Sequence, residues 1–272
     1  MLKKKLDSEF SDQVPEANNI ISTLKRGEFK AYYQPKVELN SLELSGLEVL
    51  ARWQHPSSHI LTPDHFLNAV QVAGLLNELT HSLVDQALDT HDILMRSGID
   101  VPMALNLETS QIGDSDFICA LIAQVSHNTI RPQPLTIEIT ENGGDALTSS
   151  RFIENMTKLT TSGWRLSIDD FGTKHSALER ICQIPCSEIK IDQSFTRNML
   201  TSARYKKIVK HIIAIGKSMQ MNVVAEGIET LQQLNFLQEF GCDQGQGFLF
   251  SAALSAEDIE QWCLKWNGAL LL

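Results

Sequence analysis

The sequence predicts an α/β protein, a closed (β/α)₈ barrel of the TIM type, and three observations point to it. Short β-rich runs alternate with helical segments of roughly 10–18 residues, which indicates βα units around a parallel sheet. About eight such runs within some 240 residues favour a closed barrel over an open doubly wound sheet. No glycine-rich turn follows the first strand, which weighs against a dinucleotide-binding fold.

The first part of the chain departs from this alternation. Residues 1–15 are polar and predict a lead or linker, ahead of one domain that spans residues 16–272. A short helix is expected from Ala17 to Gly27, and two β-rich runs follow it, Phe29–Leu39 and Leu42–Trp53. Because a two-residue link joins these runs, we expect an antiparallel hairpin.

The remaining elements follow from hydrophobic periodicity and from glycine or proline stops. The expected helices are Asp64–Val72, Leu76–Met95, Asp114–Asn128, Ser150–Thr161, Ser176–Cys182, Ser202–Met219, Leu231–Phe240 and Ala256–Trp266. The expected strands are Pro102–Leu107, Leu135–Ile139, Trp164–Ile168, Glu188–Ile191, Asn222–Ala225 and Gln246–Phe250. In such barrels the side chains at the carboxyl ends of the strands face the catalytic mouth.

The composition restricts the class of function. A hydrophobic content of 43% and a charged content of 21% are typical of a soluble globular protein. The net charge of −10 argues against binding to a DNA or RNA polymer, which requires a basic face. A nucleotide substrate remains compatible with this charge, because bound metal ions reverse its local sign.

The cysteines indicate the compartment. The five cysteines have no disulfide-framework spacing, and no second Cys/His pair accompanies Cys182 and Cys186 at zinc spacing. Free thiols are typical of a reducing cytosol. No run approaches the ~18 apolar residues of a membrane-spanning helix, and the basic start lacks the apolar stretch of a signal peptide. We therefore predict a cytoplasmic protein without a membrane segment.

Polar groups end six predicted strands in series. If these strands are parallel neighbours, the groups gather at one rim of the barrel. They are Glu48, Asn106, Glu138, Asp169, Asp170, Lys190, Asp192 and Glu226. Two carboxylates about 5 Å apart repel by roughly 3 kcal/mol at an effective dielectric constant near 20. Such a group must take up protons or bind cations.

The ligand types indicate which cations. Oxygen ligands suit Mg²⁺, Mn²⁺ or Ca²⁺ better than zinc. The adjacent Asp169 and Asp170 suggest two ions, because one carboxylate can bridge both while its neighbour holds the second. Paired ions serve phosphoester hydrolysis. Lys190 has two open roles: it orients or deprotonates the attacking water, or it neutralises surplus charge. Loss of its proton would need a lowered pKa, which carboxylates oppose and metal ions favour.

Each motif also has a structural interpretation. The Asp169–Asp170 pair could cap the next helix, and Glu48 could form an ion pair with Arg52. Glu226 could be a strand end ahead of an acidic residue at a helix N-terminus. Lys190 between two isoleucines is harder to explain, because a buried lysine needs a partner. The occurrence of all these motifs in one chain favours the catalytic interpretation.

The same segments resemble the EAL-domain cyclic di-GMP phosphodiesterases, from roughly Glu28 to Leu254. The family-typical motifs appear in order as Tyr33-Gln-Pro35, Glu48-Val-Leu-Ala-Arg-Trp53, Asn106-Leu107, Glu138-Ile-Thr-Glu141, Asp169-Asp-Phe-Gly-Thr173, Lys190-Ile-Asp192, Glu226-Gly-Ile-Glu-Thr230 and Gln246-Gly-Phe248. Val49 stands where the name-giving motif has alanine. The family's barrel has an antiparallel first strand, which agrees with the early hairpin.

The resemblance implies hydrolysis of cyclic di-GMP to linear pGpG with two Mg²⁺ or Mn²⁺ ions, by a homodimer. By position, the implied metal ligands are Glu48, Asn106, Glu138, Asp169, Asp170 and Glu226. Lys190, Glu226 and Glu48 take the catalytic positions. The implied substrate or neighbouring residues are Gln34, Leu50, Arg52, Asp192, Glu229 and Gln246. Glu141 matches the acid that anchors the loop after Asp170.

That loop departs from the family pattern. Lys174 and His175 stand where the family has glycine and an aromatic residue. If the glycine position needs a positive φ, a lysine costs about 1 kcal/mol there. Degraded loops accompany inactive relatives, so a catalytically weak or inactive cyclic di-GMP sensor is the alternative. A third hypothesis is another acid-rich barrel enzyme that stabilises an enolate with Mg²⁺. Because every implied ligand and Glu141 are present, we expect an active phosphodiesterase.

Overall fold

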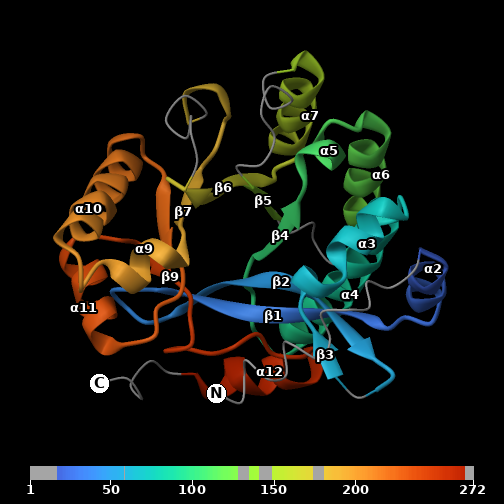
Figure 1. The fold of residues 1–272 in the computed structure, drawn as a ribbon, viewed down its shortest axis with the longest axis horizontal. Helices are drawn as coiled ribbons and strands as arrows, with labels where there is room; N and C mark the ends of the chain where they lie inside the picture. Colours follow the sequence, from blue (N-terminus) through green and yellow to red (C-terminus); the bar gives the residue numbers. More distant parts are fainter. Residues whose placement is uncertain (1–16, 58, 128–134, 141–148, 174–180, 267–272) are drawn as a thin grey trace. The chain divides into compact units, whose positions relative to one another are not determined.

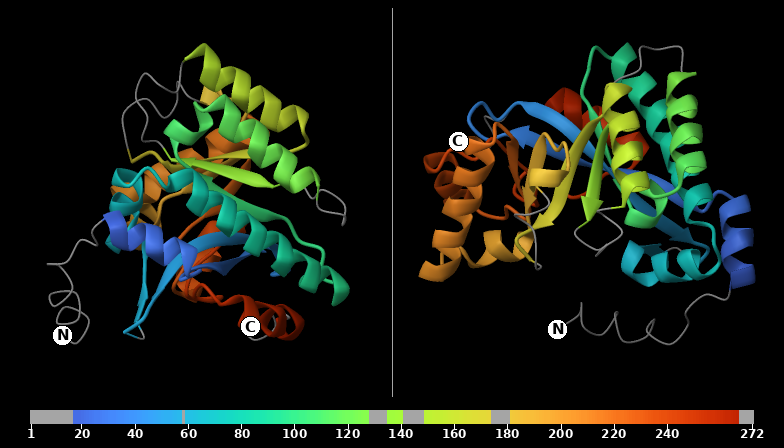
Figure 2. Two further views of the ribbon diagram at one scale, coloured as in Figure 1. Left: turned by 90° about the vertical axis from the view of Figure 1, so that its right-hand side faces the viewer. Right: turned by 90° about the horizontal axis from the view of Figure 1, so that it is seen from above.

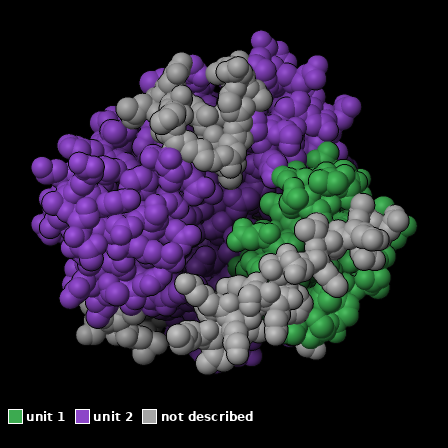
Figure 3. All heavy atoms as spheres, viewed as in Figure 1, with its two compact units in different colours: residues 1–32, 51–86 green, residues 33–50, 87–272 purple. Residues whose placement is uncertain are grey.

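The protein is described by a computed structural model that covers residues 17–57, 59–127, 135–140, 149–173 and 181–266. The chain forms two compact units, shown in separate colours in Figure 3: residues 1–32 and 51–86, and residues 33–50 and 87–272. The predicted lead at residues 1–15 lies outside the described residues, and the prediction of one domain from 16 to 272 stays a prediction.

Nine strands among the described residues form one sheet. They are β1 (Phe29–Glu38), β2 (Leu44–His55), β3 (His59–Leu61), β4 (Met103–Leu107), β5 (Thr136–Thr140), β6 (Arg165–Phe171), β7 (Glu188–Ile191), β8 (Asn222–Ala225) and β9 (Gln244–Gly245). Their order is β1-β9-β8-β7-β6-β5-β4-β2-β3, and β1 also pairs with β2. This last pairing closes the sheet into a barrel, with β3 added to β2 as a hairpin. The predicted fold class is confirmed.

The strand directions match the prediction. β1 pairs antiparallel with β9 and β3 pairs antiparallel with β2, while the successive pairs from β2–β4 to β8–β9 are parallel. Because the strands of this series run parallel, their carboxyl ends lie at the same end of the barrel. The first strand is therefore antiparallel, as expected.

The helices follow the strands in the predicted alternation (Figures 1 and 2). They are α2 (Ala17–Lys25), the 3₁₀ turn η1 (Pro63–His65), α3 (Leu67–Val72), α4 (Leu76–Arg96), α5 (Thr109–Ile112), α6 (Ser115–Ser126), α7 (Ser150–Thr161), α9 (Gln193–Asn198), α10 (Ala203–Ser218), α11 (Leu231–Glu239) and α12 (Ala256–Lys265). The short helices α5 and α9 were not predicted, because a single turn carries too little periodicity.

The core of the larger unit lies between its strands and helices. Ile189 of β7 and Val223 of β8 are fully buried, and Ile213 of α10 and Leu237 of α11 are buried with them. These positions alternate with the inward-facing residues of the strands, since successive side chains of a strand point to opposite faces. The apolar outer face therefore packs on helices, and the other face is left to line the barrel.

The residues 17–32 and 51–86 have an aromatic centre of their own. The ring of Phe29 lies 5.8 Å from Trp53 and 5.0 Å from Phe66, centroid to centroid. The indole of Trp53 donates a hydrogen bond of 3.0 Å to Glu28 Oε2. This bond satisfies the one polar atom of a buried aromatic side chain.

The prediction of a last strand at Gln246–Phe250 is wrong. The strand is β9, at Gln244–Gly245, and the chain then turns, with the Phe250 amide bonded to the Gly247 carbonyl at 3.0 Å. Gly247 lies so close to the backbone of Ile228 that no side chain fits there. The apolar run therefore forms a turn rather than a strand. The predicted helix Ser176–Cys182 falls largely outside the described residues.

None of the helices within the described residues combines the length and the apolar character needed to cross a bilayer.

Candidate functional site

The larger unit brings strand-end residues from six strands together around one lysine. Lys190 of β7 is fully buried, with an exposed fraction of 0%. Its Nζ contacts four carboxylates, namely Glu48 Oε2 at 3.3 Å, Glu138 Oε2 at 2.7 Å, Asp169 Oδ1 at 3.4 Å and Glu226 Oε1 at 2.7 Å. One ammonium cannot balance four carboxylates. The group, which we call the Lys190 cluster, therefore carries surplus negative charge when its acids are ionised.

Strand register explains this convergence. Asn106 of β4 is paired directly with Glu138 of β5, so the two side chains emerge on the same face. The Asn106 amide donates to Glu48 Oε1 at 2.9 Å, which links β4 to β2. The amide nitrogen is thus used as a donor, and the amide oxygen is the atom that could bind a cation.

The pKa values of Glu48 and Lys190 reflect opposite charges in close contact. Burial opposes ionisation of Glu48, but Lys190 and hydrogen bonds from Gln246 and Asn106 lower its pKa to about 2. Burial also opposes the charged form of Lys190, yet the surrounding carboxylates raise its pKa well above the ordinary value. Without bound metal ions, Lys190 is therefore an ammonium ion at neutral pH.

At Glu138 and Glu226, in contrast to Glu48, burial outweighs the opposing effects and raises the pKa. Burial raises the pKa of Glu138 well above its usual range, and the charge of Glu48 adds to the effect. Burial, opposed by Lys190 and supported by Asp169, raises the pKa of Glu226 to about 8. Without a cation, the Lys190 cluster therefore retains protons that a divalent ion would displace.

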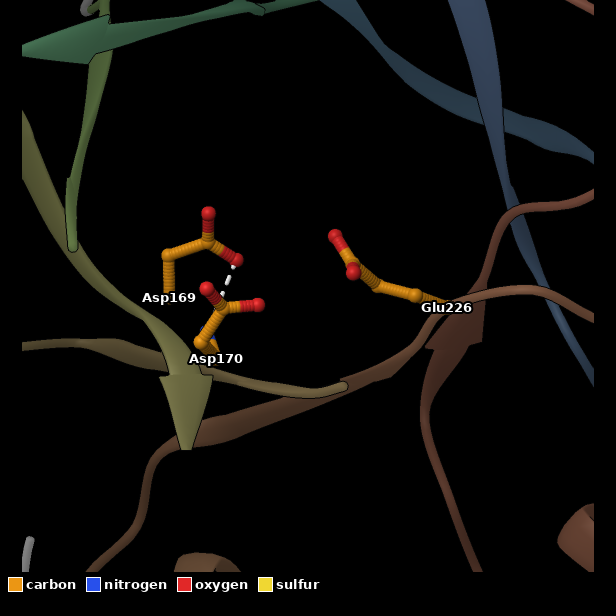
Figure 4. A group of neighbouring side chains, drawn as sticks. All are labelled: Asp169, Asp170 and Glu226. Atoms are coloured by element: carbon orange, nitrogen blue, oxygen red, sulfur yellow. Dashed lines mark hydrogen bonds between the residues drawn. The ribbon is translucent and has the colours of Figure 1, made fainter. Parts of the chain in front are cut away.

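A second group of oxygens lies beside Lys190. Asp169, Asp170 and Glu226 are half-buried and offer ligand atoms within 4.8 Å of one another, and Figure 4 shows their carboxylates turned toward a common space. Asp170 has a positive φ of 55°. The register of β6 against β7 shifts between Ile168 and Phe171, so this part of the strand is irregular. The irregularity lets two consecutive carboxylates serve one site, although regular strand residues point to opposite faces.

The donor set fits divalent metal ions. Its ligands are carboxylate and amide oxygens, which bind Mg²⁺, Mn²⁺ and Ca²⁺. Within the described part of the chain, the buried Oε1 of Glu138 has no hydrogen-bond partner, while its Oε2 accepts from Lys190. A buried carboxylate oxygen is normally satisfied, so this atom is suited to a cation.

Gln246 contributes in a way that sequence reasoning missed. Its Nε2 donates to Glu48 Oε2 at 2.6 Å and lies 3.3 Å from Glu226 Oε1. A position expected to contact substrate thus joins two predicted metal ligands from β2 and β8. The sequence could not reveal these bonds, because the partners of Gln246 lie on segments that are distant in the chain.

The other predicted substrate residues form contacts outside the Lys190 cluster. Gln34 donates to the Ser251 carbonyl at 3.3 Å, Asp192 accepts from the Ser194 amide at 3.0 Å and caps α9, and Glu229 pairs with Arg197 at 3.4 Å. Leu50 is half-buried at the end of the larger unit's part of β2. Arg52 belongs to the other unit, where it bonds to the Ala51 carbonyl at 2.8 Å. Glu141, Lys174 and His175 lie outside the described residues.

Gly227 sets the path of the chain directly after Glu226. Its φ is +66°, and a Cβ there would lie 2.7 Å from the Cβ of Gln193. We expect Gly227→Ala to lower the free energy of unfolding by about 1–3 kcal/mol, through backbone strain together with the steric contact. Urea unfolding measures the change.

Gly163→Ala is the matched control for this substitution. Its φ is +87°, but nothing lies within 4 Å of the added carbon. It should therefore show the strain of about 1 kcal/mol alone. Equal losses of stability in the two variants would contradict the close approach at Gly227.

The comparisons with known proteins agree with this geometry. The profile of the EAL domain matches residues 17–253. The chain belongs to the EAL domain family. Its relative "Cyclic di-GMP phosphodiesterase RocR" of Pseudomonas aeruginosa is 34% identical over 251 residues, which cover 92% of this chain and 64% of that protein. The chain therefore spans less than two thirds of RocR.

Solved EAL structures share the fold. The chain is similar to "PaMucR Phosphodiesterase, c-di-GMP complex", with a TM-score of 0.82, 30% identity, and coverage of 89% of this chain and 98% of that one. It is also similar to "Structure of EAL Enzyme Bd1971 - cAMP and cyclic-di-GMP bound form", with a TM-score of 0.84 and 29% identity. That match covers 91% of this chain and 68% of the other. The family predicted from the motifs is confirmed.

Proposed function

We propose that this protein is a metal-dependent phosphodiesterase that hydrolyses cyclic di-GMP to linear pGpG. The observation that carries the proposal is the Lys190 cluster, in which a buried ammonium contacts four carboxylates from four strands. The relatives RocR, a cyclic di-GMP phosphodiesterase, and PaMucR, a phosphodiesterase in complex with c-di-GMP, suggest the substrate class.

The proposed metal ligands are the strand-end oxygens of the Lys190 cluster and its neighbours. They are Glu48, Asn106, Glu138, Asp169, Asp170 and Glu226. Two ions are proposed, because Asp169, Asp170 and Glu226 form one group while Glu138 Oε1 is available deeper in the barrel. Mg²⁺ and Mn²⁺ suit such oxygens. When bound, the ions would lower the pKa of water and stabilise charge on the phosphate oxygens.

The protein's own residues would then hold and orient the reactants. Lys190 is charged in the metal-free protein, and we assign it to the attacking water, which it would orient or, once metal ions favour loss of its own proton, deprotonate. Gln246 keeps Glu48 and Glu226 in fixed directions through its amide nitrogen. Glu48 is held ionised, which makes it a ready cation ligand. Gln34, Leu50, Arg52, Asp192 and Glu229 remain candidates for substrate contact.

The deciding experiment follows cyclic di-GMP and pGpG by chromatography with Mg²⁺, with Mn²⁺ and with EDTA. We expect pGpG only in the presence of a divalent ion. Binding of cyclic di-GMP without product at every ion concentration would favour the sensor instead. Activity in Glu48→Ala equal to that of the parent would favour the third hypothesis, an enzyme that stabilises an enolate.

Binding of a divalent ion is expected to release protons at pH 7. Glu226 has a pKa of about 8, and the pKa of Glu138 is also raised, so both tend to be protonated without metal. A ligand must be deprotonated to bind a cation, so the affinity for Mg²⁺ should rise as the pH increases through the Glu226 pKa of about 8. Calorimetry in two buffers with different ionisation enthalpies counts the released protons. A count of zero at pH 7 would contradict these pKa shifts.

Three further assignments complete the proposal. All five cysteines are free, which agrees with a cytoplasmic protein. One catalytic domain is proposed for residues 16–272. A homodimer is proposed from the family resemblance, and sedimentation that shows only monomer at tens of micromolar would count against it.

A further inference from the structure

A second buried ion pair lies inside the barrel, away from the strand-end residues. Lys36 of β1 donates from Nζ to Glu188 Oε1 of β7 at 3.0 Å. The two residues are only 5% and 7% exposed. Their charges are therefore almost completely removed from water.

This pair crosses the interior of the barrel. In the sheet order, β9 and β8 separate β1 from β7, so the two side chains can meet only through the interior. Gly46 of β2 lies beside the lysine stem: a Cβ there would touch Lys36 Cε at 3.5 Å, an ordinary contact, and would approach the Pro102 carbonyl oxygen more tightly, at 3.2 Å. A larger residue at position 46 would press on the lysine stem.

The pair lies next to the residues that hold Lys190. Glu188 precedes Lys190 by two positions on β7, so both side chains are on the inner face of the barrel. Lys36 is also close enough for its charge to favour the ionised form of Glu138, against the larger effect of burial. Glu188 is thus a fifth interior carboxylate, and Lys36 neutralises it.

Stability alone does not explain a buried ion pair at this place. Two buried charges lose their hydration, and hydrophobic residues of similar volume are often as stable or more so. The bond to Lys36 has a different consequence, which concerns Lys190. Because Glu188 accepts a hydrogen bond from Lys36, the ammonium of Lys190 is left to the four carboxylates of its own cluster.

We infer that Lys36 is a positioning residue for Lys190. By binding Glu188, it prevents this carboxylate from drawing the Lys190 ammonium down the barrel, away from the proposed metal ions. The inference rests on the proposed function for its kinetic consequences, but its consequence for metal binding is independent of catalysis.

The test compares Lys36→Met, Glu188→Gln and the double variant Lys36→Met/Glu188→Gln with the parent. In Lys36→Met, the free Glu188 competes for Lys190, and we expect kcat to fall at least tenfold while KM changes less than threefold. The double variant has no competing carboxylate, so its kcat should return to within threefold of the parent. Glu188→Gln alone should keep kcat within threefold as well. Lys217→Met is the control, because Lys217 forms an exposed pair with Asp243.

Mn²⁺ binding, measured by electron paramagnetic resonance without substrate, gives the second result. When Lys190 moves away from the carboxylates, its ammonium no longer competes with a metal ion for them. Lys36→Met should therefore bind Mn²⁺ at least threefold more tightly than the parent. The double variant should regain the parent Kd. If Lys36→Met acted only by loosening the packing around the site, it should bind Mn²⁺ more weakly than the parent. Circular dichroism reports the folded fraction, to which all values are scaled.

Besides weaker Mn²⁺ binding by Lys36→Met, two outcomes would overturn the inference. One is Lys36→Met with unchanged kcat and Mn²⁺ affinity, and the other is a double variant as impaired as Lys36→Met. If the parent itself makes no pGpG, the proposed function fails, while the Mn²⁺ titrations still decide whether Lys36 positions Lys190.

Discussion

Replacing Lys190 with methionine is expected to lower the rate of pGpG formation by about 10²–10⁴-fold, the range typical of a lost positioned acid–base or water-orienting group. Methionine preserves most of the side-chain volume and removes the charge. The four carboxylates around position 190 then lose their internal cation. The measurement is single-turnover hydrolysis followed by chromatography.

The same variant should bind metal more tightly while it turns over more slowly. Its carboxylates would repel one another without a cation, so we expect lower thermal stability in EDTA and a larger stabilisation by Mn²⁺ than in the parent. Lys217→Met serves as control, since an exposed ion pair contributes only about 0–1 kcal/mol. Retention of more than half of the parent rate in Lys190→Met would exclude the assigned role.

The second large effect is expected at Asp170, where a carboxylate and an unusual backbone conformation coincide. Asp170→Asn should reduce pGpG formation by roughly 10²-fold or more, because a bound divalent ion contributes several kcal/mol to the transition state. Asparagine tolerates the positive φ of 55° as aspartate does. Asp170→Asn should therefore add no backbone strain, and urea unfolding in EDTA measures its effect on the free energy of unfolding.

Asp170→Ala separates the backbone from the carboxylate. Both variants lack the charge, but alanine is strained at positive φ, so Asp170→Ala should be less stable than Asp170→Asn by about 1 kcal/mol. Urea unfolding in EDTA measures this difference, and the Mg²⁺-induced rise in melting temperature should shrink in both. Full activity in Asp170→Asn would remove Asp170 from the metal ligands.

Several features were predictable because their causes are local. Helical and strand periodicity reproduced α7 (Ser150–Thr161), β7 (Glu188–Ile191) and β8 (Asn222–Ala225) with their observed bounds. Strand alternation placed Glu48 and Lys190 on inward-facing positions. The predicted strand at Gln246–Phe250 was wrong because a tertiary contact decides the conformation there. Gly247 lies against the backbone of Ile228, and the chain turns after β9 instead of continuing as a strand.

The sequence by itself determined the barrel, the family and the set of acidic side chains at the strand ends, because periodicity and motifs are written along the chain. Only the tertiary structure decided which of these groups touch. Barrel closure brings Glu48, Glu138, Asp169 and Glu226 onto the one ammonium of Lys190, gives Gln246 two carboxylates to hold, and sends Lys36 across the interior to Glu188. Contacts between distant strands depend on sheet order and register, and neither is encoded in the spacing of residues within a single strand.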